Sequence, residues 1–273
     1  MEEPDPLLAG LEVPQIPHLF HLEVLHVNNF VEEQRVFPTI TNLVTQHLFS
    51  LLDENKAAQL AIQLLRCTPP PDSSDESPVR SLYAPVLQIG DRPSPLAANF
   101  PVFFGMESPL ADLVSLLGSQ QPYVFDEEAI QEFPFPASVR SLVMFPIQSR
   151  AKLAGCFLVT SCISDFFTSE RRKIVYGLCV ALTLAFGQAD FYNVQRLALA
   201  NLPEFSIQIA HTVQNPLKDR RQTLRASLDE HGVHLNNQKL EILAIQELER
   251  DLIALQQKLH RDHIQESAPP VER

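Results

Sequence analysis

The sequence predicts an α+β protein, in which an antiparallel sheet is flanked by helices and followed by a C-terminal antiparallel helical hairpin. Two features of the sequence lead to this fold class. Residues 139–148 and 153–163 are apolar runs of strand length on either side of a short turn, which is the pattern of a β-hairpin. Residues 205–263 instead repeat apolar side chains at helical spacing and are divided by a turn at residues 229–232.

Composition and charge narrow the class of protein. The chain has 273 residues, of which 45% are hydrophobic and 20% are charged, and this is a globular composition. At about 150 residues per domain, the length predicts one or two domains. The formal net charge is −12, and residues 1–80 contribute most of it with 4 basic and 12 acidic side chains. A protein that binds duplex DNA needs a basic face, so we expect no nucleic-acid partner.

The cysteines and the apolar runs predict a cytoplasmic protein. Cys67, Cys156, Cys162 and Cys179 form no C-x-x-C pair, which favours reduced thiols. The acidic, proline-bearing start is unlike a signal peptide. The longest uncharged apolar stretch, residues 174–189, has 16 residues and is short for a bilayer span, so we expect no membrane partner.

The first third of the chain predicts a lead segment and then a helix. Pro4, Pro6, Pro14 and Pro17 predict an irregular lead over residues 1–35. From residue 28 to about residue 67 the apolar side chains follow helical spacing, and Pro38 either starts this helix or kinks it. Residues 57–67 either finish the helix or begin a strand.

The middle of the chain reads as short strands separated by turns. Proline, serine and aspartate over residues 68–78 indicate a loop. Gly118 fits the end of a short helix at residues 110–117. Besides the hairpin, the apolar patterns predict strands at residues 81–89, 99–104 and 123–125.

Three helical segments are expected after the hairpin. Thr168 is a candidate N-cap for a helix that we extend to Leu199, before Pro203. A segment from Phe205 to Leu228 carries Pro216, which we expect to kink it. A further helix begins after Asn236 or Asn237 and runs to His263, and residues 264–273 are expected to be a disordered tail.

The C-terminal helices predict self-association. Apolar residues of the last helix follow steps of three and four, which is a coiled-coil seam two heptads long, at Ile245, Leu248, Leu252, Leu255 and Leu259. Two copies of the hairpin would form a four-helix bundle, with a core completed by Ala210, Val213, Leu217, Leu224 and Leu228. We therefore expect a homodimer through residues 204–263.

Residues 135–191 resemble a GAF domain, a family of small-molecule sensor modules. The resemblance rests on the strand Ser141–Ile147 with its Ser-x-hydrophobic-x-x-Pro-hydrophobic pattern, on Gly155, and on the Phe-Thr-x-Glu-like helix start at Phe167 and Thr168. Residues 110–126 also match the family's short helix, turn and strand. The resemblance implies a GAF-like sensor domain over residues 36–195 with a pocket for a small-molecule ligand. A related PAS-like fold is the alternative.

A second resemblance begins at Phe205. The stretch FSIQIAHTVQNPL is similar to the H-box of the dimerisation and phosphoacceptor hairpin of sensor histidine kinases, and residues 247–261 resemble the second helix of that hairpin. The resemblance implies that His211 is a candidate phosphoacceptor and Asn215 a candidate phosphatase-type position. It also implies a two-component signalling protein, with a response regulator or a separate ATPase domain as partner.

Two departures from this family argue against kinase activity. The family has a carboxylate at the position of Thr212, and a hydroxyl is a weaker partner for the imidazole. The sequence also has no glycine-rich lid of an ATP-binding domain, because its 8 glycines are not clustered. We therefore expect a signal-transduction module without its own kinase activity, in which His211 belongs to a decayed H-box. The alternative is a histidine phosphotransferase or a split sensor histidine kinase that uses His211.

We expect no cofactor and no metal ion. Cys156 and Cys162 share a strand face about 20 Å apart, too far for a disulfide, and are expected to be small buried hydrophobic residues. No cysteine lies beside a histidine as in bilin-binding members of the family, and no cyclic-nucleotide motif is present, so the ligand-binding residues stay unknown. The histidines lack the spacing of HExxH. A third class, a transcriptional or scaffold protein, lacks support because no basic helix-turn-helix is evident.

Overall fold

The chain forms two compact units in a computed structural model. The model describes residues 18–30, 33–71, 77–84, 101–106, 122–125, 130–131 and 135–267. Unit 1 comprises Met1–Leu65, Leu87–Ala98 and Leu116–Val194, and unit 2 comprises Arg66–Val86, Asn99–Ser115 and Gln195–Arg273. Both units contain strands and helices, so the α+β class is confirmed. The division differs from the predicted domains, because strands from the first half of the chain belong with the C-terminal helices.

Unit 1 is a sheet covered by helices. Its strands lie in the order β1-β6-β5-β4, and β7 pairs with β6. The strands are β1 (Ala61–Cys67, of which residues 61–65 lie in this unit), β4 (Tyr123–Phe125), β5 (Ser141–Ser149), β6 (Lys152–Ser161) and β7 (Tyr192–Asn193). The helices are α1 (His18–Phe30), α2 (Glu33–Leu52) and α5 (Ser169–Leu182), with 3₁₀ turns at Thr183–Ala185 and Gln188–Asp190.

The predicted β-hairpin is confirmed as β5 and β6, an antiparallel pair with Val143 opposite Val159 and Phe145 opposite Phe157. Arg150, in the turn, adopts a left-handed φ of 57°. The register shifts between Ile147 and Gln148, which is a β-bulge or a similar irregularity. Both faces of the hairpin are buried, as its apolar side chains on both faces predict.

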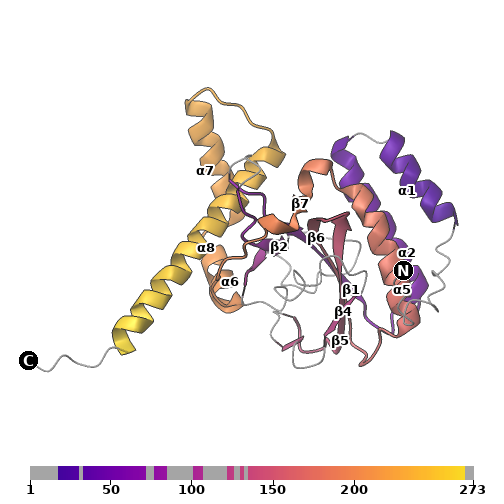
Figure 1. The fold of residues 1–273 in the computed structure, drawn as a ribbon. Helices are drawn as coiled ribbons and strands as arrows, with labels where there is room; N and C mark the ends of the chain where they lie inside the picture. The colour runs from indigo at the N-terminus through magenta and orange to yellow at the C-terminus, as the bar shows by residue number, and fades with distance from the viewer. Residues whose placement is uncertain are drawn as a thin grey trace, which may run out of the picture. The chain divides into compact units, whose positions relative to one another are not determined.

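Three helices lie on one side of the sheet of unit 1, where α5 packs on β5, α2 lies beside α5, and α1 packs on α2 (Figure 1). In α2, Ile40, Val44 and Leu48 recur every four residues and are fully buried, which is why this segment folds as a helix against the strands. The helix begins at Glu33 and continues through Pro38, so the proline does not start it. The buried core of this face also includes Phe20, Val24, Leu64, Phe145, Phe157, Val159, Val175, Leu178 and Leu182.

The predicted irregular lead was wrong for residues 18–30. These residues form α1, whose Phe20, Val24 and Val27 are buried at helical spacing. The prolines that indicated an irregular segment all precede this helix, so they do not interrupt it. Residues 57–67, left open between helix and strand, include strand β1.

Thr168 is the N-cap of α5, as predicted, and its side chain accepts a hydrogen bond from the backbone N–H of Arg171 at 3.4 Å. The predicted continuation of this helix to Leu199 was wrong. Gly187 is extended, with φ −72° and ψ 160°, and the following residues form β7 on the edge of β6. A single rigid helix therefore does not span residues 168–200.

Unit 2 contains the end of β1, two short strands and three helices. Strand β2 (Leu82–Ala84) is antiparallel to Arg66 and Cys67 at the end of β1, and also to β3 (Val102–Phe104). A 3₁₀ turn at Val194–Arg196 leads into this unit. The helices are α6 (Phe205–Gln214), α7 (Leu217–Glu230) and α8 (Asn237–Ser267). The predicted strands 81–89 and 99–104 correspond to β2 and β3, whereas residues 110–118, predicted as a short helix, lie outside the described residues.

The predicted antiparallel helical hairpin is formed by α7 and α8. The turn at residues 229–232 ends α7, with Gly232 in the left-handed region and the N–H of Val233 donating to the carbonyl of Leu228 at 2.8 Å. Ion pairs join the two helices, with 2.7 Å between Arg220 and Asp251. Pro216 separates α6 from α7 instead of kinking one helix.

The predicted seam of α8 is used inside unit 2. Ile245, Leu248 and Leu252 are buried against Tyr83 of β2 and Phe103 of β3. The interpretation of these three residues as the core of an interface between two copies was therefore wrong. Leu255 is half-buried and Leu259 is exposed. The helix also reaches Ser267, so residues 264–267 of the predicted tail are helical, and residues 268–273 lie outside the described residues.

Two polar contacts fix β3 within unit 2. The side-chain amide of the buried Gln208 accepts a hydrogen bond from the N–H of Phe103 and donates one to its carbonyl, both at 2.9 Å. The carbonyl of Ala200 accepts a hydrogen bond from the N–H of Met106 at 3.0 Å. A Cβ on Gly105 would lie 2.1 Å from that same carbonyl oxygen, so the close approach requires glycine.

The substitution Gly105→Ala should destabilise unit 2 by about 2–3 kcal/mol, because the added methyl group meets a fixed backbone atom. Urea denaturation followed by circular dichroism measures the change. Gly187→Ala is the matched control, because its Cβ would lie 3.6 Å from the nearest atom and we expect a change within about 0.5 kcal/mol. Equal effects of the two substitutions would contradict the close approach at Gly105.

Candidate functional site

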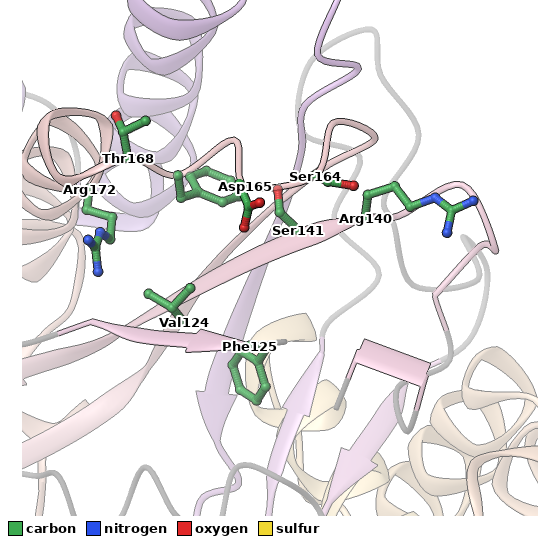
Figure 2. A pocket seen from close by; sticks show the side chains of 9 residues that line it. Val124, Phe125, Arg140, Ser141, Ser164, Asp165, Thr168 and Arg172 are labelled. Atoms are coloured by element: carbon green, nitrogen blue, oxygen red, sulfur yellow. The ribbon is translucent and has the colours of Figure 1, made fainter. Parts of the chain in front are cut away.

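Unit 1 contains a cavity of about 550 Å³ at one end of its sheet. This volume lies within the range of about 300–1,000 Å³ that is usual for small-molecule sites. The lining comes from β4, the start of β5, the loop after β6 and the first turn of α5 (Figure 2). The lining residues are Val124, Phe125, Arg140, Ser141, Ser164, Asp165, Phe167, Thr168 and Arg172.

Hydrogen bonds hold the walls of the cavity in place. The hydroxyl of Ser141 donates to the carbonyl of Ile163 at 2.9 Å, which ties the start of β5 to the loop after β6. The N–H of Arg140 donates to the carbonyl of Ser161 at 2.8 Å. Phe125 and Phe167 are buried and supply apolar surface. The cavity is therefore formed by the folded backbone and does not need a ligand to shape it.

The charged groups of the cavity are not paired with one another. In the described part of the chain, Arg172, Asp165 and Arg140 make no ion pair, and the Nε of Arg172 is buried without a hydrogen-bond partner. The neighbouring Arg171, by contrast, donates to the carbonyl of Phe166 at 2.8 Å and stacks on its ring. Figure 2 shows Arg140 extending away from Asp165 and Arg172. The cavity is thus lined by one carboxylate and two guanidinium groups, and only that of Arg140 extends away from Asp165.

The candidate residues of the H-box lie on α6, in unit 2. His211 is half-buried in the last turn, and its Nε2 is buried without a hydrogen-bond partner. Asn215 ends the helix, and both its N–H and its side-chain amide donate to the carbonyl of His211. The two residues are adjacent, but the contact is to the backbone of His211 and leaves its imidazole unassisted. An imidazole needs an accessible nitrogen to accept a phosphoryl group, and Nε2 is not accessible here.

Thr212 replaces the family's carboxylate and is itself buried. Its hydroxyl donates to the carbonyl of Gln208, one turn earlier on α6, at 2.9 Å. The side chain is therefore directed at its own helix backbone and does not assist His211.

The sequence interpretation missed a buried carboxyl group in unit 2. Glu249 on α8 is 5% exposed, and its Oε1 accepts a hydrogen bond from the hydroxyl of Ser81 at 2.5 Å. The hydroxyl of Ser81 also lies 2.7 Å from that of Thr68. Since Ser81 donates to the carboxyl group, Thr68 donates to Ser81, and the three groups form a chain.

Burial raises the pKa of Glu249 to about 7, although the Ser81 hydrogen bond and the charges of Arg80 and Arg250 act to lower it. The sequence did contain an indication of this site. Glu249 follows Leu248 and lies four residues after Ile245, so it falls on the apolar face of the helix.

The cysteines and the metal-binding groups give no further site. All four cysteines are free, and burial raises the pKa of the Cys179 thiol far above its usual range. In the described ranges, no three histidine, cysteine, aspartate or glutamate side chains are grouped so that they could hold a metal ion. No described helix is long and apolar enough to span a bilayer.

Comparisons with known proteins do not assign a family. No family model matches the chain, and no curated protein matches it. A solved structure that is similar to the chain is the GAF domain of a phosphoenolpyruvate-protein phosphotransferase from Acinetobacter. The identity is 12% and the TM-score 0.38, over 61% of this chain and 89% of that one. At this identity and TM-score the likeness carries no argument about family or function.

The substitution Glu249→Gln should raise stability at pH 8 by roughly 2 kcal/mol and change it little at pH 5. Because folding raises the pKa of Glu249 from 4.5 to about 7, the folded state is favoured while the group is protonated. The contribution of protonated Glu249 to the stability of the folded state is complete below about pH 4.5 and is lost as the pH rises through 7. Urea denaturation at the two pH values measures it.

The half-buried neighbour Glu247 provides the control for this prediction. The change in stability caused by Glu247→Gln is the baseline with which that of Glu249→Gln is compared. A Glu249→Gln protein that keeps the pH dependence of the unsubstituted protein would contradict the assignment.

Proposed function

We propose that the chain is a signal-transduction protein, in which unit 1 senses a small molecule and the helical hairpin of unit 2 serves as a non-catalytic interaction element. The observation that carries the proposal is the cavity of unit 1, which is of ligand size and lined by charged side chains without partners. The resemblance of residues 135–191 to GAF sensor modules supports the same function.

The way in which the cavity is built favours binding over catalysis. Its walls are held by the β5–β6 ladder and by the Ser141–Ile163 hydrogen bond, so a ligand meets a preformed site. Asp165 and Arg172 contribute opposite charges to the cavity, which suit the recognition of a charged ligand. Such a site recognises a ligand and holds it.

Coupling between the units requires a route other than the helix that the sequence predicted. The chain crosses between the two units five times, and two of these crossings lie within the described residues, one inside β1 between Leu65 and Arg66 and one between Val194 and Gln195. We propose that these two crossings carry the response, because a continuous helix over residues 168–200 is absent.

Self-association through residues 204–263 remains part of the proposal, on a smaller surface than the sequence predicted. Ile245, Leu248 and Leu252 are already buried inside unit 2. The exposed apolar side chains left for a second copy include Val213 and Leu259. A stable interface buries about 1,200–2,000 Å², so we propose a weak or ligand-dependent dimer.

The alternative function is histidine phosphotransfer through His211, with a response regulator or a separate ATPase domain as partner. The α7–α8 hairpin after the H-box-like stretch favours it. Against it stand the buried Nε2 of His211 and the side chain of Thr212, which bonds to its own helix.

Incubation with a phosphorylated response regulator, or with a separate kinase ATPase domain and ATP, tests this alternative. We expect no acid-labile phosphate on the protein, because the imidazole lacks both an accessible Nε2 and an assisting carboxylate. Label that appears on the natural chain and disappears in His211→Ala would establish the alternative and contradict the non-catalytic role.

A thermal-shift screen with a small-molecule library tests the sensor function, using Val124→Trp to fill the cavity. Val124 is 45% exposed and lines the cavity, whereas Val180, on α5, is 49% exposed and does not. A ligand should raise the melting temperature of the natural protein and of Val180→Trp but not of Val124→Trp. A shift that persists in Val124→Trp would place the ligand elsewhere and overturn the proposal.

A further inference from the structure

The guanidinium of Arg172 lines the cavity without a partner, whereas three other arginines of the described residues have one, although the Nε of Arg220 is also buried without a hydrogen bond. Arg196 donates to the carbonyl of Ser77, Arg171 donates to the carbonyl of Phe166, and Arg220 pairs with Asp251. Arg172 lines the cavity of unit 1, and the described residues provide no acceptor for its side chain. Its Nε is shielded from solvent as well, so water does not replace the missing partner.

An unpartnered donor of this kind is unfavourable in the empty cavity. A buried polar group without a partner costs about 1–3 kcal/mol, and a charged group costs more. The buried Nε is itself out of a ligand's reach, but a ligand that brings an acceptor to the rest of this guanidinium gains a charge-assisted hydrogen bond. The planar guanidinium fork matches the two oxygens of a carboxylate or of a phosphate group.

Asp165 restricts which anions fit. Its carboxylate lines the same cavity as Arg172 and forms no ion pair with it. A simple anion would be repelled by this carboxylate, whereas a molecule that also carries a protonated amine would be attracted to it. Phe125, Phe167 and Val124 offer apolar surface for the hydrocarbon part of such a molecule.

We propose that the cavity of unit 1 binds a small amphoteric molecule, with its carboxylate or phosphate group on Arg172 and its protonated amine facing Asp165. The inference rests on the proposed sensor function and adds the chemical class of the ligand. Amino acids and phosphorylated amines belong to this class.

Isothermal titration calorimetry on the full chain tests the inference. The probes are the common α-amino acids and phosphoethanolamine, with butyrate and butylamine as single-charge comparisons. We expect at least one amphoteric probe to bind more tightly than either comparison. Arg172→Gln should weaken that binding at least tenfold, which corresponds to the roughly 1.5–3 kcal/mol of a hydrogen bond to a charged group.

Matched variants separate the two contacts. Lys173→Gln removes a neighbouring charge on the same helix that does not line the cavity, and it should leave binding unchanged within twofold. Asp165→Asn should weaken binding of the amphoteric probe and reduce the preference of the protein for that probe over butyrate. Arg172→Lys keeps the positive charge but lacks the planar guanidinium group, so this variant should bind the amphoteric probe with intermediate affinity. It also serves as the test variant if Arg172→Gln does not fold, as judged by circular dichroism.

Failure of this inference is distinguishable from failure of the sensor function. The inference is overturned if no amphoteric probe binds the natural protein, or if Arg172→Gln and Lys173→Gln have equal effects. If an uncharged ligand instead stabilises the natural protein and Val180→Trp but not Val124→Trp, the sensor function stands and the ligand class proposed here is wrong.

Discussion

Burial of the first half of α8 against β2 and β3 is the constraint on which unit 2 depends. Leu248 and Leu252 are fully buried there, in the same cluster as Tyr83 and Phe103. Polar contacts then fix the position of the helix along the strands. Glu249 accepts from Ser81, and the side-chain amide of Gln246 donates to two proline carbonyls in the loop after β1. Buried polar groups of this kind tolerate few alternative arrangements, since any slip leaves them unpaired.

Buried nitrogens without a hydrogen-bond partner occur in both units, at Arg172 in unit 1 and at His211 and Arg220 in unit 2, so the proposed roles rest on the cavity of unit 1. In unit 2, the buried carboxyl and amide groups of α8 all find partners within the chain. In unit 1, the β5–β6 hairpin builds a cavity in which Arg172 and Asp165 face open space without pairing. Polar groups that are hydrogen-bonded within the chain stabilise the fold. Polar groups that line a cavity without a partner are available to a ligand. The proposed function assigns recognition to unit 1 because its unpaired guanidinium and carboxylate line a cavity of ligand size.

The sequence predicted the features that local chemistry determines. The β5–β6 hairpin and the N-cap at Thr168 depend on a few adjacent residues, and both are confirmed. The seam of α8 was recognised as an apolar face but assigned to a second copy, because periodicity shows that a face is buried without showing what covers it. The cavity could not be predicted, since Val124, Ser141 and Arg172 come together only when distant segments fold.

Hydrogen exchange along α8, measured at two protein concentrations, tests most directly whether this helix belongs to the core of its own chain. The account predicts strong protection of the amides of residues 245–252 at both concentrations, because their burial is intramolecular. It predicts fast exchange over residues 260–263, where the side chains are exposed. Protection of residues 245–252 that appears only at the higher concentration would contradict the account, because it would show that a second copy of the chain covers this face.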